Sequence, residues 1–157
     1  MAKLNRIGLD VSKSQKLIKR LNDLLANYEL FYQNARGFHW NIRGENFFEL
    51  HLKFEELYTD ALIKIDEIAE RILTLEGTPL HVFSDYIKHA EIKEIKNISD
   101  GKKAVKEVVN GFQTLMIIER EILDFASSAG DEGTNALMSD YIREQEKTVW
   151  MYSAYLN

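Results

Sequence analysis

Residues 46–75, which read NFFELHLKFEELYTDALIKIDEIAERILTL, decide the fold. Apolar side chains recur in this stretch at steps of three and four residues, which is the spacing of one face of an α-helix. The series consists of Phe54, Leu57, Tyr58, Ala61, Ile65, Ile68, Ile72 and Leu75. Gly77 and Pro79 follow the series, and both residue types end helices. The stretch therefore predicts one long amphipathic helix over 46–75.

The same periodicity occurs three more times, over 13–36 ending near Gly37, over 101–128 ending at Gly130, and over 134–155. The connection over 76–100 is too long for a tight turn, and His81–Ile87 within it favours a short helix. Four long helices with one long crossover are typical of ferritin-like bundles. We therefore expect an all-α, ferritin-like four-helix bundle with a short helix in the crossover between the second and third long helices. A single domain should span 1–157, with residues 1–12 as a short N-terminal tail.

Composition restricts the chemistry. The chain has no cysteine, so any metal must be held by histidine and carboxylate side chains. The N-terminus lacks the apolar run of a signal peptide, and no stretch approaches the roughly 18 apolar residues of a membrane span. We therefore expect a cytoplasmic protein with no membrane contact. The net charge of −5 disfavours a surface that grips nucleic acid throughout.

The first 20 residues are locally basic. Lys13, Lys16 and Arg20 have the spacing of a solvated helix stripe, which leaves Lys3 and Arg6 in the tail. A short basic N-terminal arm is the alternative interpretation.

Two pairs of metal-ligating residue types lie on the helix over 46–75. His51 and Glu55 are four residues apart, and so are Asp66 and Glu70, so each pair shares a helix face. The 11 residues from Glu55 to Asp66 return to within about 20° of the same direction, which places both pairs on one stripe. They also rise about 16 Å along the axis, so one chain cannot bring both pairs to one ion.

A second copy of the helix would solve this problem. The two pairs are placed symmetrically about the point between Asp60 and Ala61. An antiparallel copy, related by a two-fold axis at that point, would set His51 and Glu55 of one chain opposite Glu70 and Asp66 of the other. Such a dimer would hold two equivalent sites about 22 Å apart.

Histidine with carboxylates suits iron, zinc or manganese in the divalent state. The chain has no Glu-x-x-His, so it cannot build the intrachain di-iron centre of ordinary four-helix carboxylate proteins. Trp40, next to His39, is suited to give up an electron and intercept an oxidising radical. These features favour iron chemistry.

Each residue also has a plainer interpretation. Glu67 and Arg71 could form an ordinary ion pair on a solvated face. His39 could cap a helix or lie in the core, and Trp40 could simply pack in a loop. His81 and His89 have no partners at ligand spacing, so we expect them at a surface or an interface.

Asp131 and Glu132 stand between two glycines near the start of the last helix. They could interact with the dipole of that helix, or line an ion pore where symmetry copies meet. The sequence favours the first interpretation.

The sequence resembles the Dps family, the mini-ferritins named as DNA-binding proteins from starved cells. The resemblance is carried by Phe38–Gly44 (FHWNIRG), Phe47–His51 (FFELH), Asp66–Ile72 (DEIAERI) and Gly77–Leu80 (GTPL), and it runs from about residue 15 to the end. It implies a dodecameric hollow shell that oxidises Fe(II), usually with hydrogen peroxide, and stores the ferric mineral. The ferroxidase sites would lie at two-fold interfaces, with His39, His51 and Glu55 from one subunit and Asp66 and Glu70 from its neighbour.

The chain departs from the family at several positions. Glu55 stands where aspartate is commoner, and Ser127 and Ala136 stand where relatives often carry further pore aspartates. The alternative function is that of a nucleoid protein that binds DNA through basic N-terminal tails, which the summed negative charge of twelve chains would oppose. A helical oligomer without metal chemistry is a third and plainer reading.

Overall fold

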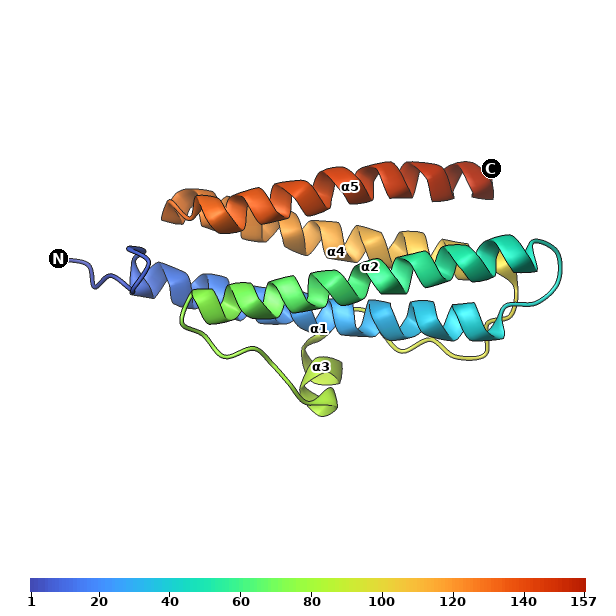
Figure 1. Cartoon of the computed structure of the whole chain (residues 1–157), viewed down its shortest axis with the longest axis horizontal. Helices are drawn as coiled ribbons and strands as arrows, with labels where there is room; N and C mark the ends of the chain where they lie inside the picture. Colours follow the sequence, from blue (N-terminus) through green and yellow to red (C-terminus); the bar gives the residue numbers. More distant parts are fainter.

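The computed structural model describes residues 1–157 and contains five helices and no strand. The helices are α1 (Val11–Asn41), α2 (Phe47–Thr74), α3 (Phe83–His89), α4 (Gly101–Ala129) and α5 (Glu132–Leu156). Figure 1 shows the four long helices lying side by side, with α3 set apart in the crossover between α2 and α4. The predicted all-α bundle and its crossover helix are confirmed. None of the helices combines the length and apolarity that crossing a membrane requires.

Aspartate side chains fix where three of the long helices begin. Asp10, Asp100 and Asp131 accept hydrogen bonds from the backbone N–H groups of Lys13, Lys103 and Thr134, at 3.0, 2.8 and 3.0 Å. Each bond satisfies one of the amide groups that a helix start leaves without a partner. The aspartates therefore define the helix starts.

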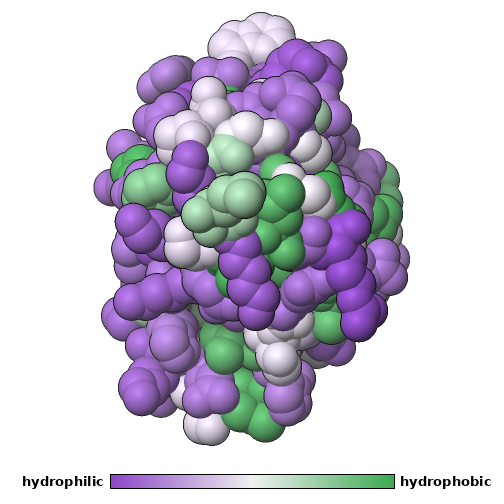
Figure 2. Space-filling model, turned by 90° about the vertical axis from the view of Figure 1, so that its left-hand side faces the viewer, coloured by the Kyte–Doolittle hydropathy of each residue, from purple (hydrophilic) through white to green (hydrophobic).

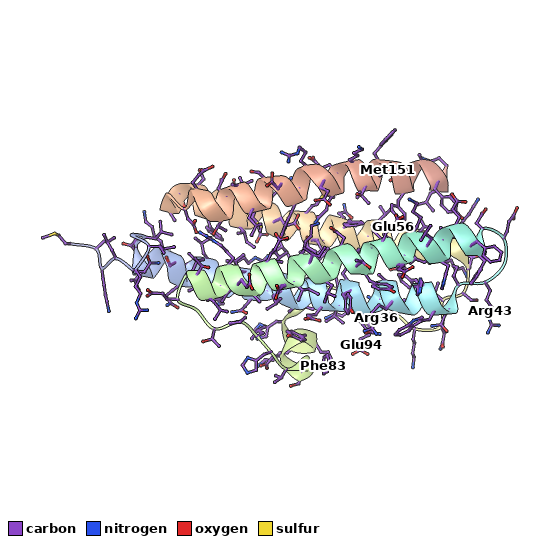
Figure 3. All side chains as sticks on the ribbon, in the orientation of Figure 1. Arg36, Arg43, Glu56, Phe83, Glu94 and Met151 are labelled. Atoms are coloured by element: carbon purple, nitrogen blue, oxygen red, sulfur yellow. The ribbon has the colours of Figure 1, made fainter.

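The core lies between the four long helices and contains 28 buried residues in one cluster, among them Leu21, Phe54, Leu115 and Met138. The crossover is bound to the outside of α1 by amide side chains. Asn27 Oδ1 accepts from the backbone N–H groups of Glu91 and Ile92, and Asn34 bonds to the backbone of Lys93 and Ile95. On the other side of the bundle a groove runs between α2 and α5, with Glu56 and Met151 among the residues that line it (Figure 3).

The end of the first helix differs from the prediction. The helix does not end near Gly37 but continues to Asn41. Phe38 and Ile42 are both buried in the core, so the apolar stripe extends beyond the glycine. A glycine inside a helix costs only about 1 kcal/mol, which the burial of these two side chains outweighs.

The N-terminal segment also differs from a free arm. Leu4 and Asp10 form an isolated β-bridge, and the backbone N–H of Arg6 donates to Glu76 Oε1 at 3.0 Å. The segment is therefore folded back onto the end of α2. Arg20 is not simply solvated, because it forms ion pairs with Asp23 and Glu121.

Candidate metal centre

His39 near the end of α1 and His51 near the start of α2 form a reciprocal pair. Their rings stack with centroids 3.7 Å apart and planes 12° from parallel. His39 Nδ1 lies 2.6 Å from the backbone oxygen of His51, and His51 Nδ1 lies 2.7 Å from the backbone oxygen of His39. The chain reversal between the two helices therefore fixes the position of both imidazoles.

These hydrogen bonds also fix which ring nitrogens are free. A carbonyl oxygen only accepts hydrogen bonds, so each Nδ1 must carry the proton and donate it. In the neutral imidazole the lone pair then lies on Nε2, ready to bind a metal. A backbone carbonyl that orients a ligating histidine in this way is a recurrent feature of metal sites. The arrangement explains why His39 and His51 are suited to act together.

Packing holds the pair in place. His39 is only 8% exposed, and the ring of Tyr58 meets it edge-on at a centroid distance of 5.4 Å. On the other side Phe47 stacks on His51 at 5.1 Å. His39 is therefore buried, as the plainer interpretation of this residue expected. Its Nε2 is nevertheless free to bind a metal.

The three predicted carboxylate ligands have no interaction partner within the chain. Glu55, Asp66 and Glu70 are exposed on α2, and their carboxylates form no hydrogen bond or ion pair within the chain. The ion pair between Glu67 and Arg71, which was the plainer interpretation of these residues, does not form. Glu67 instead accepts from the Tyr141 hydroxyl at 3.0 Å, and Arg71 is bound elsewhere.

The histidine pair, His39 and His51, and the acidic pair, Asp66 and Glu70, remain separate within one chain. No group of three or more histidine, aspartate or glutamate side chains is close enough to hold a metal ion. The predicted ligands thus form two incomplete half-sites on one face of α2. Large apolar side chains are exposed among them on the same helix, namely Leu52, Leu62, Ile63 and Leu73. An exposed apolar stripe of this kind marks a contact surface.

Trp40 lies near the end of α1 and is 57% exposed. The guanidinium of Arg36, one helical turn earlier, lies 4.7 Å from its ring and 5.2 Å from the ring of Tyr32. In Figure 3 Arg36 lies on the side of α1 that faces away from α4 and α5, above Glu94 and Phe83. Trp40 is therefore an exposed residue of α1 with a cation–π contact, and it does not pack in a loop.

Asp131 and Glu132 have different surroundings. The carboxylate of Asp131 is buried, where it caps α5 and accepts from Arg71 Nη2 at 2.7 Å and from Thr134 Oγ1 at 2.6 Å. Glu132 is exposed. Of the two, only Glu132 has a side chain that faces solvent, as a pore lining requires. Figure 2 looks onto the end of the bundle where α5 begins, and its surface there is largely hydrophilic with separate apolar patches.

The two histidines of the crossover are exposed, as expected of surface residues. His81 Nδ1 lies 2.9 Å from the Pro79 carbonyl oxygen, and His89 Nδ1 lies 3.4 Å from Asp23 Oδ1.

Two features of the structure were not predicted from the sequence. One is the contact of Tyr58 with His39. The other is a buried polar cluster in the middle of the bundle, in which the Tyr28 hydroxyl donates to Glu119 and accepts from Gln145. The cluster residues come from three helices, so no spacing along one helix connects them. A polar residue inside an otherwise apolar stripe, such as Glu119 within α4, was the only available signal.

Comparison with known proteins agrees with this fold. The ferritin-like domain matches residues 18–157, so the chain is a ferritin-like protein. The chain is 47% identical over 148 residues to a DNA protection during starvation protein of Porphyromonas gingivalis, a match that covers 94% of this chain and 93% of that protein.

Solved structures give the same result. The crystal structure of a Dps protein from Vibrio cholerae O1, described as a member of a superfamily of ferritin-like diiron-carboxylate proteins, is 59% identical with a TM-score of 0.97 and covers 100% of this chain and 98% of that one. A Dps protein from Bacillus brevis is 38% identical with a TM-score of 0.90, covering 93% and 98%. Within the ferritin-like proteins, the chain belongs to the Dps family.

Proposed function

We propose that this protein is an iron-storing mini-ferritin that oxidises Fe(II), preferably with hydrogen peroxide, and stores the ferric product in a hollow shell. The observation that carries the proposal is the reciprocal histidine pair. His39 and His51 are fixed with Nε2 free, and the carboxylates of Glu55, Asp66 and Glu70 on the adjoining helix are unpaired. Imidazole and carboxylate donors suit ferrous iron. Zinc and manganese would compete for the same donors.

The site is completed by a second copy of the chain. About a two-fold axis between Asp60 and Ala61, His39, His51 and Glu55 of one chain would meet Asp66 and Glu70 of the partner. The exposed apolar side chains of α2 support this contact, because Leu62 and Ile63 lie next to the axis and would be buried by it. The further assembly into a homododecamer rests on membership of the Dps family.

The chemistry protects the cell from oxidative damage. Two ferrous ions held together supply both electrons that hydrogen peroxide needs for its conversion to two molecules of water. No hydroxyl radical is then released, as it is when one ferrous ion reacts with peroxide alone. Trp40 would act as a sink for oxidising equivalents that escape, since it follows His39 in the sequence and its indole is accessible.

The first experiment loads the purified protein anaerobically with Fe(II), divides the sample, and follows near-ultraviolet ferric absorbance after addition of hydrogen peroxide or air. We expect a fast rise with peroxide and a slow one with air. A rate no faster than a protein-free control in both cases would contradict the proposal.

A complementation experiment tests the shared site. His39→Ala and Asp66→Ala should each abolish fast oxidation, because each removes a ligand from every site. Dimers that contain one chain of each variant have one doubly altered site and one intact site. Random co-assembly by unfolding and refolding the mixture should therefore restore about a quarter of the sites. Refolding each variant alone is the control, and no recovery in the mixture would mean that the ligands do not come from two chains.

DNA binding is the second candidate function, favoured by the name of the Porphyromonas gingivalis relative. The folded-back N-terminal segment presents only Lys3 and Arg6, against a net charge of −5 per chain. We therefore expect any DNA binding to be weak and to disappear between low and physiological salt in a gel-shift assay. A shift that persists at physiological salt would favour the nucleoid function.

A further inference from the structure

A row of aromatic rings on α1 and α2 extends from His39 through Tyr58 to Tyr32. The ring of Tyr58 on α2 is edge-on to His39, with centroids 5.4 Å apart and planes at 80°. The ring of Tyr32 on α1 is edge-on to Tyr58, with centroids 6.0 Å apart and planes at 88°. Both tyrosines are only half-buried. Electron transfer between rings in contact is fast, because its rate falls steeply with separation.

We propose that Tyr58 is a redox-active residue of the iron site, which donates an electron through the His39 ring when a site holds only one ferrous ion. The inference rests on the proposed function, since it needs iron at His39 and hydrogen peroxide as oxidant. Tyr32 is the next ring in the row and would pass an electron to the Tyr58 radical in turn.

The reaction balances with one ferrous ion and one tyrosine as the two electron donors. Hydrogen peroxide accepts two electrons and two protons, its O–O bond breaks, and two molecules of water form. The ferrous ion supplies one electron and becomes ferric. The phenol of Tyr58 supplies the second electron and one proton, and becomes a neutral tyrosyl radical. The second proton comes from solvent. The site thus completes a two-electron reduction of peroxide without a second iron and without releasing hydroxyl radical.

The charge near each ring favours Tyr58 over Trp40 as the first donor. Oxidation of an indole first leaves a positive charge on the ring, and the Arg36 guanidinium 4.7 Å from the Trp40 ring opposes that charge. Tyrosine loses its proton as it is oxidised, so its radical is neutral. No cationic side chain lies over the Tyr58 ring. Tyr58 also touches His39 directly, whereas Trp40 has no ring contact with that histidine.

The experiment uses the assembled protein with one ferrous ion per site, mixed with hydrogen peroxide and frozen within milliseconds for electron paramagnetic resonance. We expect a tyrosyl signal whose hyperfine lines narrow when ring-deuterated tyrosine is incorporated. Tyr58→Phe keeps the edge-on ring contact but cannot form a neutral phenoxyl radical. This variant should lose the tyrosyl signal and release more hydroxyl radical to a spin trap.

Two variants serve as controls. Tyr152→Phe alters a half-buried tyrosine on α5 outside the aromatic row and should leave the signal unchanged. Trp40→Phe should retain the tyrosyl signal. If Tyr58→Phe keeps the full signal, or if the signal is tryptophanyl and disappears only with Trp40→Phe, the inference is wrong. If the wild-type protein does not oxidise iron faster than the protein-free control, the proposed function itself fails, which the ferric absorbance reveals separately.

Discussion

Glu119 is the most unusual single residue of the bundle, because its side chain is fully enclosed between the four long helices. Tyr28 donates a hydrogen bond to one carboxylate oxygen, while the other oxygen has no partner. Burial raises the pKa of Glu119 to about 7, against the opposing effects of Tyr28, Gln145, Lys64 and Arg120. A proton on the unpartnered oxygen would make it a donor, and the side-chain amide oxygen of Gln145, in the same cluster, also lacks a partner.

Glu119 therefore makes the free energy of unfolding depend on pH. Its folded-state pKa of about 7 lies above the ordinary value of 4.5, so the folded protein binds the proton more tightly. Protonation of Glu119 therefore contributes to the free energy of unfolding. This contribution is fully present below pH 4.5 and is lost as the pH rises through 7. Glu119→Gln stays neutral, so its stability relative to wild type should rise by roughly 3 kcal/mol between pH 4.5 and 8.

Urea unfolding of both proteins, at equal concentration and at several pH values, checks this prediction. Asp124→Asn alters an exposed carboxyl on the same helix and should stay within about 0.5 kcal/mol of wild type at every pH. A constant difference between Glu119→Gln and wild type across this pH range would show that Glu119 does not titrate there.

At the scale of helices, the sequence predicts what one helix determines by itself. The apolar spacing of α2 and the four-residue steps from His51 to Glu55 and from Asp66 to Glu70 are properties of a single helix. They were sufficient to predict the bundle and to place these four ligand candidates on one helix face. Contacts between helices were not predictable in this way. The stacking of His51 on His39 and the edge-on contact of Tyr58 depend on how α1 and α2 pack.

The boundaries of the helices illustrate the same limit. Gly37 has the sequence signature of a helix end, but the burial of Phe38 and Ile42 extends α1 past it. Glu67 and Arg71 have the spacing of an ion pair within α2, but each instead bonds to a residue on α5 or at its start. Tertiary packing thus overrides local signals wherever the side chain reaches another element.

Asp131 connects two helices and should be important for stability. It caps α5 through Thr134 and neutralises Arg71 of α2, whose side chain is only 20% exposed. Asp131→Ala removes the cap and leaves the guanidinium without its partner, so we expect a loss of about 2–4 kcal/mol in the free energy of unfolding. Urea denaturation followed by circular dichroism measures this loss.

Asp140→Ala is a suitable control for Asp131→Ala. Asp140 is on the same helix, and its ion pair with Arg143 is exposed. The change should cost no more than about 0.5 kcal/mol. If both variants lose the same small amount of stability, the buried link between α2 and α5 is not a determinant of stability.

At the scale of the whole molecule, the two incomplete half-sites and the apolar stripe lie on the same helix, α2. Within one chain, Leu62 is 52% exposed and Ile63 is 55% exposed. Both lie on α2 between the two pairs of candidate ligands, and neither is part of the buried core. Burial of such side chains against a second copy would stabilise the dimer by an amount that scales with the apolar area removed from water. The same contact would bring the histidine pair of one chain to the acidic pair of the other. A change that breaks the α2 contact should therefore abolish both assembly and iron oxidation.

Leu62→Glu tests this coupling because the position is exposed in the single chain and lies next to the proposed two-fold axis. Two symmetry-related glutamates would approach each other there without partners, so the variant should elute as smaller species in light-scattering chromatography while its helix content is unchanged. It should also lose fast peroxide-dependent iron oxidation, although every candidate ligand is intact. Gln113→Glu adds the same charge at an exposed position on α4 and should assemble and oxidise iron normally. A Leu62→Glu variant that is dissociated but fully active would place the iron site within one chain, and one that is fully assembled would place the two-fold contact elsewhere.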